Sequence, residues 1–471
     1  MTETADLYDC IVVGAGYAGL AAAKHIIDND PSRRVLVLEA RDRVGGKAFT
    51  KVDGYGHHYD IGPAFLGIGQ HMMYDLAKEY GVETYRVPDK GKLVLKVDSS
   101  AKKYSGWIPP IGLHRLPELG LALVRFERKI KKIDPKAPWA HPKAAKWDKM
   151  TFREWIDKHV SSRRSRGAFD LGCEAITGMS ADNCSLLYVL FVFRTTGSFE
   201  TAVTSIGGLQ QDLMRGGAMA IPVKMAESIG TKATIKLDEP VTSVDYSPVD
   251  NGCRVSTPKG SYRGQRLIMA IPPNFVPKVQ FNPALPKEKA SLLESFQAGT
   301  MIKLTASYET PFWKKMGLCG EGTGIGGLLT NVFDVGLPDP GAPGHLIAFV
   351  CATRCEKWLT LSDEEKKKNV LDELIAMFGE QAKAPTELLW DESLVKGEKA
   401  SGCPFASPTT GKLSEFGSWI RKPVGPIHWA GTETSDRYYG YMEGAVTSGR
   451  RAAEEVLEAL KKVSEATNDV H

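Results

Sequence analysis

The sequence has no apolar run long enough to cross a membrane. Its longest apolar stretches, residues 186–193 and 118–124, fall far short of the roughly 20 residues that a transmembrane helix needs. Residues 1–8 are polar and acidic and lack the basic start and apolar stretch of a signal peptide. These absences predict a soluble, cytoplasmic protein without a membrane anchor.

Cysteines at metal-binding spacing are missing too. The eight cysteines are scattered without a CxxC pair or a Cys/His cluster, so the sequence predicts neither a metal site nor a disulfide scaffold. A strong excess of one charge is also absent, because 60 Lys and Arg are nearly balanced by 56 Asp and Glu. The resulting net charge of +4 is too small to indicate a nucleic-acid partner.

What is present is a long globular chain with mixed patterns. Its 471 residues are 42% hydrophobic, and chains of this length divide into roughly two to four domains. A mostly helical region ends near residue 195, and strand-like segments return between 234 and 270. The alternation predicts an α/β protein whose domains are discontinuous in the sequence.

Some boundaries follow from local patterns. Thr151 and Glu154 fit a capping box and predict a helix that begins at residue 152. We expect a strand over 301–308 and an amphipathic helix over 363–378. The stretch 129–149 is basic and interrupted by prolines, which predicts a surface connection.

The N-terminal segment has the pattern of a dinucleotide-binding βαβ unit. A β-branched run at 9–13 predicts a strand, 20–27 predicts a helix, and 34–38 predicts a second strand. Between and after them stand three glycines and one acidic residue: Gly14, Gly16, Gly19 and Glu39. A glycine motif alone also occurs in surface turns, but the flanking strand, helix and acidic residue favour dinucleotide binding.

Each residue of this motif has a physical role. Gly14 allows a tight turn, Gly16 lets backbone amides approach a pyrophosphate, and Gly19 lets the helix pack closely on the strand. The pyrophosphate would lie at the helix N-terminus, where free amides and the helix dipole favour anions. Glu39 is placed to accept hydrogen bonds from a ribose diol.

Segments far apart in the chain then carry a family resemblance. Residues 40–47 read ARDRVGGK, and residues 427–443 read IHWAGTETSDRYYGYME. Residues 138–156, Ile302 with Lys303, and 308–314 (YETPFWK) add matches in the same order. In these segments the chain resembles the flavin-containing amine oxidases, and within them the monoamine oxidase branch.

The resemblance implies a mixed α/β (α+β) fold with two domains. A Rossmann-like FAD-binding domain would comprise residues 1–85, 206–285 and 396–465. A substrate-binding domain, with a mixed six-stranded β-sheet and helices, would comprise residues 86–205 and 286–395. Residues 466–471 would form a polar tail.

The same resemblance implies a set of FAD-binding residues. They are Gly14, Gly16, Gly19, Glu39, Arg41, Gly46, Lys47, Val241, Cys403, Thr432, Glu433 and Met442. Arg41 and Lys47 would bind the adenosine and pyrophosphate end, Val241 the adenine, and Thr432 and Met442 the ribityl and isoalloxazine end. Lys47 replaces the family's usual arginine and keeps the charge without the bidentate fork.

Cys403 occupies the position at which mammalian monoamine oxidases carry the cysteine joined to the flavin, whereas many fungal relatives bind FAD without a covalent bond. The sequence therefore leaves two readings of Cys403 open, a covalent flavin link and a buried free thiol.

Three residues are implied at the reacting centre. Lys303 matches the family lysine that holds a water against flavin N5, and Tyr441 matches one wall of the family's aromatic cage. The opposite wall falls on Pro404, where the family usually has an aromatic residue, and Phe405 is the neighbouring candidate for that face. A solvated strand lysine and a packed tyrosine are the alternatives from the residues alone.

The implied activity is the oxidation of a primary amine, aliphatic or long-chain, to an aldehyde or ketone with release of ammonia and H2O2. Soluble fungal relatives act on amino polyketides of the fumonisin type, and the resemblance extends to that substrate class. A polyamine or L-amino-acid oxidase is an alternative on the same fold, and a flavin-bearing interaction protein is an alternative of another class. The expected partners are the amine, O2 and a second copy in a homodimer.

Overall fold

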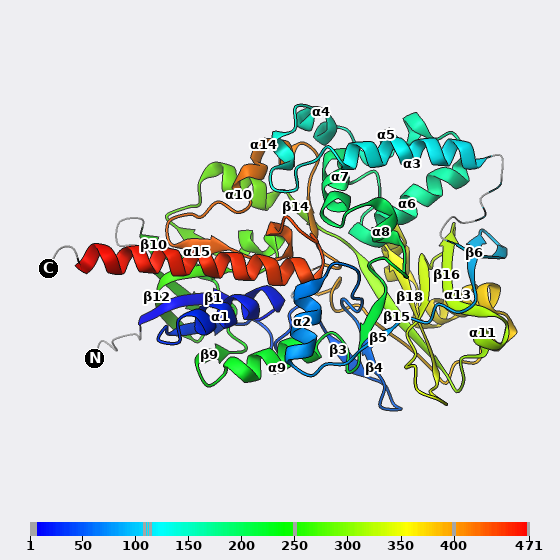
Figure 1. Cartoon of the computed structure of the whole chain (residues 1–471), viewed down its shortest axis with the longest axis horizontal. Coiled ribbons are helices and arrows are strands. Elements are labelled where there is room, and N and C mark those ends of the chain that lie inside the picture. Colours follow the sequence, from blue (N-terminus) through cyan, green and yellow to red (C-terminus); the bar gives the residue numbers. More distant parts are fainter. Residues whose placement is uncertain are drawn as a thin grey trace.

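The computed structural model describes residues 7–106, 110, 112, 115–247, 252–397 and 402–468. Two large sheets lie at opposite ends of the molecule, and a layer of helices covers the second sheet from above in Figure 1. Both described ends of the chain lie beside the first sheet, where the long C-terminal helix runs along the N-terminal helix (Figure 1).

The first sheet follows the order β13-β10-β11-β12-β1-β2-β9, and β21 pairs with β12. Its strands are β1 (Leu7–Val13), β2 (Val35–Leu38), β9 (Ala233–Lys236), β10 (Ser243–Ser247), β11 (Gly252–Thr257), β12 (Gly260–Met269), β13 (Gln280–Asn282) and β21 (Ile427–Trp429). They come from three separate stretches of the chain. β1 pairs in parallel with β2 and β12. The glycine turn that follows β1 therefore lies at the carboxyl end of these strands.

Both faces of this sheet are buried, so its central strands are continuous apolar runs. Val12 and Val37 pack against helices on one face, and Ile11 and Leu36 belong to a second apolar cluster on the other. The covering helices are α1 (Tyr17–Asn29), α2 (His71–Glu79), α9 (Ala220–Ile229) and α15 (Met442–Asn468).

The second sheet has seven strands in the order β19-β15-β18-β17-β16-β6-β7. They are β6 (Lys92–Val97), β7 (Ser100–Tyr104), β15 (Met301–Tyr308), β16 (Leu318–Ile325), β17 (Asn331–Asp334), β18 (Gly344–Cys351) and β19 (Glu387–Asp391). Ile302 and Leu304 point to an apolar cluster that includes α11 (Phe312–Lys315), α12 (Thr353–Thr360) and α13 (Asp363–Phe378). The alternate residues, Lys303 among them, therefore face the opposite side.

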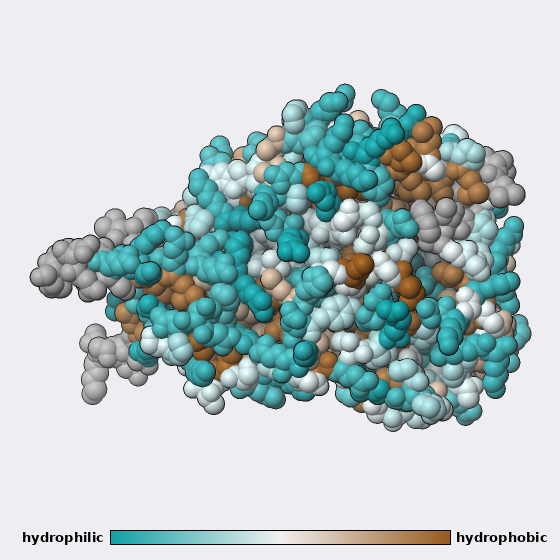
Figure 2. Space-filling model, in the orientation of Figure 1, coloured by the Kyte–Doolittle hydropathy of each residue, from teal (hydrophilic) through white to brown (hydrophobic). Residues whose placement is uncertain are grey.

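Helices cover this opposite face of the second sheet. They are α3 (Leu116–Ile130), α4 (Ala144–Lys149), α5 (Phe152–His159), α6 (Arg163–Thr177), α7 (Leu186–Thr195) and α8 (Phe199–Val203). α7 is buried along most of its length at the centre of this layer. Figure 2 shows apolar side chains over α3, on which Leu121 and Val124 are exposed.

Short elements join these layers. The short strands are β3 (Thr50–Val52), β4 (His58–Asp60), β5 (Thr84–Arg86), β8 (Asp212–Met214), β14 (Phe296–Ala298) and β20 (Ala406–Pro408). The remaining helices and 3₁₀ turns are α10 (Lys287–Glu294), α14 (Lys412–Phe416), η2 (Pro138–Ala140), η3 (Pro273–Lys278), η4 (Glu380–Lys383), η5 (Gly417–Trp419) and η6 (Thr432–Thr434). In the described part of the chain, every helix is too short or too polar to span a bilayer.

The mixed α/β class is confirmed, and so are the bounds expected for β15 and α13. Two expectations were wrong. The second sheet has seven strands rather than six, because the polar edge strand β7 joins it. Residues 129–149 are not only a surface connection, since α4 buries Trp147. Residues 466–468 form the end of α15 and 469–471 lie outside the described residues, so the polar tail over 466–471 stays a prediction.

Candidate active site

The glycine turn after β1 is built for close backbone approach. Gly14 has a φ of 103°, which L side chains rarely adopt. A β-carbon on Gly19 would lie 1.8 Å from the carbonyl oxygen of Gly14, so only glycine lets α1 start this close to the turn. Gly16 is the N-cap residue of α1 and has no side chain to satisfy the first amides. The helix N-terminus is therefore open to an anion.

Glu39 follows directly after β2, beside this turn, and is held by backbone amides. Its Oε2 accepts a hydrogen bond of 2.8 Å from the amide of Ala15, and its Oε1 accepts one of 2.9 Å from the amide of Arg41. Glu39 is only 4% exposed. Each carboxylate oxygen has a further lone pair, so the group can still accept hydrogen bonds from a diol.

A second cluster connects the glycine-rich loop to the C-terminal segment. The Nζ of Lys47 donates to the carbonyl oxygen of Pro404 at 3.1 Å and lies 3.6 Å from the Glu433 carboxylate. Glu433 also accepts a 3.2 Å hydrogen bond from the amide of Ala406. Thr432 Oγ1 accepts from the amide of Gly440 at 2.7 Å. These bonds fix residues 403–406 and 432–442 against each other.

One cavity of about 960 Å³ connects both clusters with the second sheet. All of the sequence-predicted site residues except Gly19 line it, and Gly19 lies behind the glycine turn. The open N-terminus of α1, Glu39 and Val241 line the part of the cavity at the first sheet, and Lys303 lines the part at the second sheet. A cavity that combines an anion site with an acceptor for a ribose diol fits a dinucleotide such as FAD.

Lys303, on β15, lines this cavity. It is 6% exposed, and its Nζ donates a hydrogen bond to the carbonyl oxygen of Gly62. The Nζ lies 5.4 Å from the centre of the Phe349 ring. Burial lowers the pKa of Lys303, and the nearby carboxylate of Asp60 acts in the opposite direction. Lys303 can therefore present a hydrogen-bond donor from an otherwise apolar surface.

The aromatic residues near Lys303 differ in accessibility. Tyr441 is partly buried and lines the cavity, and burial raises the pKa of its hydroxyl. Phe405 is 1% exposed, and its ring packs perpendicular to that of Tyr439 with the centroids 5.4 Å apart. A β-carbon on Gly440 would lie 2.1 Å from the Phe405 ring. Phe405 therefore packs closely against the segment that carries Tyr441, and both Pro404 and Phe405 line the cavity.

Cys403 is a buried free thiol at the cavity wall, and all eight cysteines are free and buried. Burial raises the pKa of Cys403, while the charges of Lys303 and Lys47 lower it.

The substrate half of the cavity has one face of the second sheet as its floor. Lys303 pairs with Phe349, and Asn331 and Thr323 continue the same row across β17 and β16 to Leu95. α3, α6 and α8 supply further apolar walls, through Leu119, Leu123, Phe169, Ile176 and Phe199. These apolar walls can hold a hydrocarbon chain, while Lys303, Asn331 and Thr323 place polar groups on the floor.

Sequence reasoning missed one charged residue of this half, Glu321. It lies on β16, and its Oε2 accepts a 2.8 Å hydrogen bond from Ser205 Oγ. Burial raises its pKa. Alternate residues of β16 line the cavity (Cys319, Glu321, Thr323 and Ile325), but glycines between them hide this period of two.

Comparisons with known proteins also indicate a flavin cofactor. The family model described as flavin containing amine oxidoreductase matches residues 17–457. A probable flavin-containing monoamine oxidase A of Dictyostelium discoideum is 31% identical, over 96% of this chain and 98% of its own. The flavin-containing amine oxidase A of Equus caballus is 32% identical, over 98% of this chain and 86% of its own.

Solved structures agree. A putrescine oxidase bound to putrescine has a TM-score of 0.90 at 28% identity, covering 96% of this chain and 99% of its own. A cyclohexylamine oxidase from Brevibacterium oxydans has the same TM-score, identity and coverage.

Proposed function

Because this chain belongs to the family of flavin-containing amine oxidoreductases, it is a flavin-dependent amine oxidase, and we propose that its substrate is a long-chain aliphatic primary amine. The reaction would convert R-CH2-NH2, O2 and H2O to R-CHO, NH3 and H2O2. Bound FAD supplies the acceptor for the hydride equivalent that leaves the α-carbon. Branching at that carbon would give a ketone instead of an aldehyde.

The observation that carries this proposal is the set of apolar side chains that line the cavity near Lys303, on the sheet and in the helices that cover it. Phe349 and Leu95 on the floor, with Phe169 and Ile176 in the walls, exclude water from an alkyl chain. Tyr441 would present its ring to the amino group, and Lys303 would hold a water beside the reacting carbon. Pro404 would take the place of the second aromatic wall that the family usually has, and an aliphatic residue there also favours an alkyl amine.

Glu321 favours a second candidate, an amine whose far end carries another amino group. Three strand spacings separate β15 from β16, which amounts to about 14 Å across the sheet. An extended chain gains about 1.2 Å per bond, so a diamine with roughly ten bonds between its nitrogens would reach from the Lys303 region to Glu321. Putrescine, the ligand of one structural neighbour, is a shorter diamine.

An L-amino-acid oxidase is less well supported. Such an enzyme needs a cation for the substrate carboxylate, and arginine serves best through its bidentate fork. Among the described residues, the arginine that lines the cavity is Arg41, at the nucleotide end.

Anaerobic flavin reduction tests the substrate class. Hexylamine, decylamine, 1,10-diaminodecane, spermine and leucine would each be mixed with the enzyme, and decylamine should reduce the flavin faster than hexylamine. The preference for 1,10-diaminodecane over decylamine should fall about tenfold in Glu321→Gln, the loss of one hydrogen bond to a charged group. Asp89→Asn, at an exposed acid of the same cavity, is the matched control. Lack of reduction by every amine would refute the proposal.

We further propose that Cys403 forms a thioether with the flavin 8α carbon, on the basis of its position at the cavity wall. An S–H and a C–H bond would break, an S–C bond would form, and the two electrons would pass through the flavin to O2, which becomes H2O2. Acid precipitation should then leave the flavin with the wild-type protein and release it from Cys403→Ala. Flavin released from both proteins would leave Cys403 a free thiol.

We also propose that the protein forms a homodimer and is located in the cytoplasm. The eight buried, unpaired cysteines support a reducing compartment. Sedimentation that finds only monomer at micromolar concentration would refute the dimer.

A further inference from the structure

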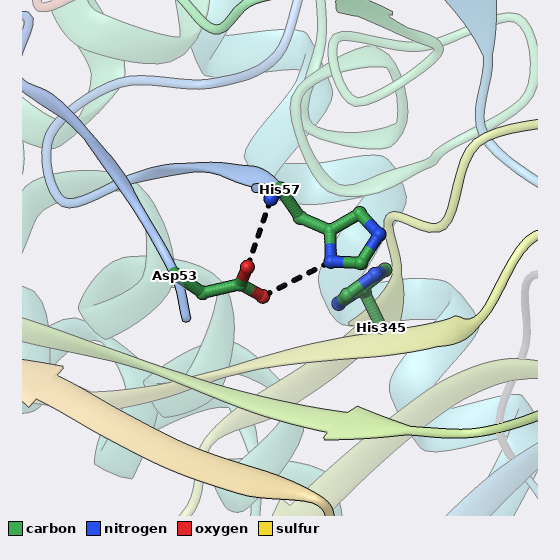
Figure 3. A group of neighbouring side chains, drawn as sticks. All are labelled: Asp53, His57 and His345. Carbon is green, nitrogen blue, oxygen red and sulfur yellow. Dashed lines mark hydrogen bonds and ion pairs between the residues drawn. The ribbon is translucent and has the colours of Figure 1, made fainter. Parts of the chain in front are cut away.

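Three potential metal ligands meet where the hairpin of β3 and β4 packs on the second sheet. Asp53 and His57 come from the hairpin loop, and His345 comes from β18 (Figure 3). One ligand atom from each residue lies within 4.8 Å of the other two. Asp53 Oδ2 is 3.2 Å from His57 Nδ1, and the two imidazole ring centres are 4.3 Å apart.

His345 has a buried nitrogen without a partner. The residue is 6% exposed, and its Nδ1 lies 3.0 Å from Ser307 Oγ. Its Nε2 has no hydrogen-bond partner among the described residues, although a buried polar atom without one is costly. When Nδ1 donates to Ser307, Nε2 carries a free lone pair. Metal-binding histidines commonly have this arrangement, in which the second ring nitrogen donates to a neighbour.

Asp53 is oriented by its own loop. Its Oδ1 accepts hydrogen bonds from the amides of Tyr55 and His57, at 2.9 and 2.8 Å. Oδ2 therefore points toward the two imidazoles (Figure 3). Glu387 lies beside Ser307 on the next strand and accepts from the amide of Gly54, which adds a second negative charge at this site. The His57 side chain is 24% exposed, so solvent and ions can reach the group.

We propose that Asp53, His57 and His345 bind a Zn²⁺ ion. Two imidazoles and one carboxylate are a donor set that zinc takes, with water in the fourth position. Ligand atoms bound to zinc at about 2.1 Å stand about 3.4 Å apart, so the ligand atoms need to approach by about 1.4 Å at most. The ion would take the place of the hydrogen between Asp53 and His57.

Such an ion would join the hairpin to the substrate half of the molecule. Beyond β4 the same hairpin leads to Gly62, whose carbonyl oxygen accepts the hydrogen bond from Lys303. The zinc ion would therefore hold the backbone partner of Lys303 at a fixed place on the sheet. Asp53 and His57 are four residues apart in the sequence, but only the fold brings His345 to them.

The test uses tag-free, FAD-containing protein that has been dialysed against a chelator. Titration with ZnCl2 should show one bound ion with a Kd below about 10⁻⁶ M, and the melting temperature should rise. His57→Gln should weaken binding by at least about 10²-fold, because even changes behind a ligand cost 10-fold to 100-fold. His58→Gln, at the exposed neighbouring histidine, is the matched control and should bind like the wild type.

His345→Gln tests the second histidine of the site, because His345 lies on the second sheet and not in the hairpin loop. Flavin absorbance and circular dichroism would first show that each variant is folded, and His57→Gln keeps the test decisive if the buried His345 variant fails to fold. Wild-type protein that binds no Zn²⁺ would overturn the proposal. Zinc binding of wild-type strength in folded His57→Gln would overturn it equally.

Discussion

Lys303, whose amino group is buried, is the residue that distinguishes an oxidase from a protein that only binds flavin. Lys303→Met keeps the length of the side chain and loses its hydrogen bonds. We expect FAD to remain bound and amine-dependent reduction to persist in part. Reoxidation by O2 should slow on the order of 10²-fold, as for the loss of one preorganised electrostatic group. Stopped-flow reoxidation of dithionite-reduced protein measures this.

Lys289 offers a control of the same type. It is 0% exposed, and its Nζ donates to the carbonyl oxygen of Trp419 at 2.7 Å, outside the cavity. Lys289→Met should lower stability and leave the O2 rate constant unchanged. Equal O2 rate constants for the wild type and Lys303→Met would remove Lys303 from the catalytic residues.

Glu321 should make the choice of substrate depend on pH. Burial raises the pKa of its carboxyl above the ordinary range, so the group loses its charge at a higher pH than an exposed glutamate. The preference for 1,10-diaminodecane over decylamine should be full above that pKa and fall as the pH decreases through it. Ratios of kcat/KM across pH measure this, and an equally steep fall in Glu321→Gln would contradict it.

At the scale of single elements, the start of α5 gives a stability prediction. Thr151 Oγ1 accepts from the amide of Glu154 at 3.1 Å, and the Glu154 carboxylate accepts from the amide of Thr151 at 2.8 Å. Thr151→Ala should cost about 1 kcal/mol, through the loss of one capping bond. Hydrogen exchange should then be about fivefold faster in the first turn of α5. Thr310→Ala, in an exposed loop, should leave α5 exchange unchanged.

Elements with a strong local pattern could be predicted from the sequence. The capping box of α5 and the bounds of α13 follow from capping side chains and apolar spacing, and both are present. α4 was missed because six residues give too little periodicity, although Asp148 is fully buried and accepts a 2.6 Å hydrogen bond from Ser185. β16 was missed because its glycines suppress the strand signal.

The residues of the candidate site also differ in whether they can be predicted from the sequence. Residues of the nucleotide end belong to short, contiguous motifs, and the sequence brings Gly14 and Glu39 close together through one βαβ unit. Glu321 and the group of Asp53, His57 and His345 depend on the pairing of strands distant in the sequence. Such pairing follows from the folded sheet and has no local signal.

At the scale of the whole molecule, the cavity that would hold FAD is lined by both large sheets. Its wall includes Val13 and Leu38 at the end of the first sheet and Lys303 and Phe349 on the second. FAD that contacts both should therefore stabilise both against unfolding. At a free FAD concentration of about 100 Kd, the gain over the apoprotein should be about 2.7 kcal/mol.

Hydrogen exchange of β1 and β18 with and without FAD checks whether this gain is shared. Both strands should lose protection together in the apoprotein, and loss confined to β1 would show that the second sheet is stable by itself.

Glu39→Gln should weaken the binding of FAD without abolishing it. The amides of Ala15 and Arg41 donate to different oxygens of Glu39, and in glutamine one of these oxygens is replaced by an NH2 group that cannot accept. The variant should bind FAD more weakly and need more FAD to reach the same melting temperature, whereas a wild-type Kd would show that Glu39 contributes little to holding the nucleotide.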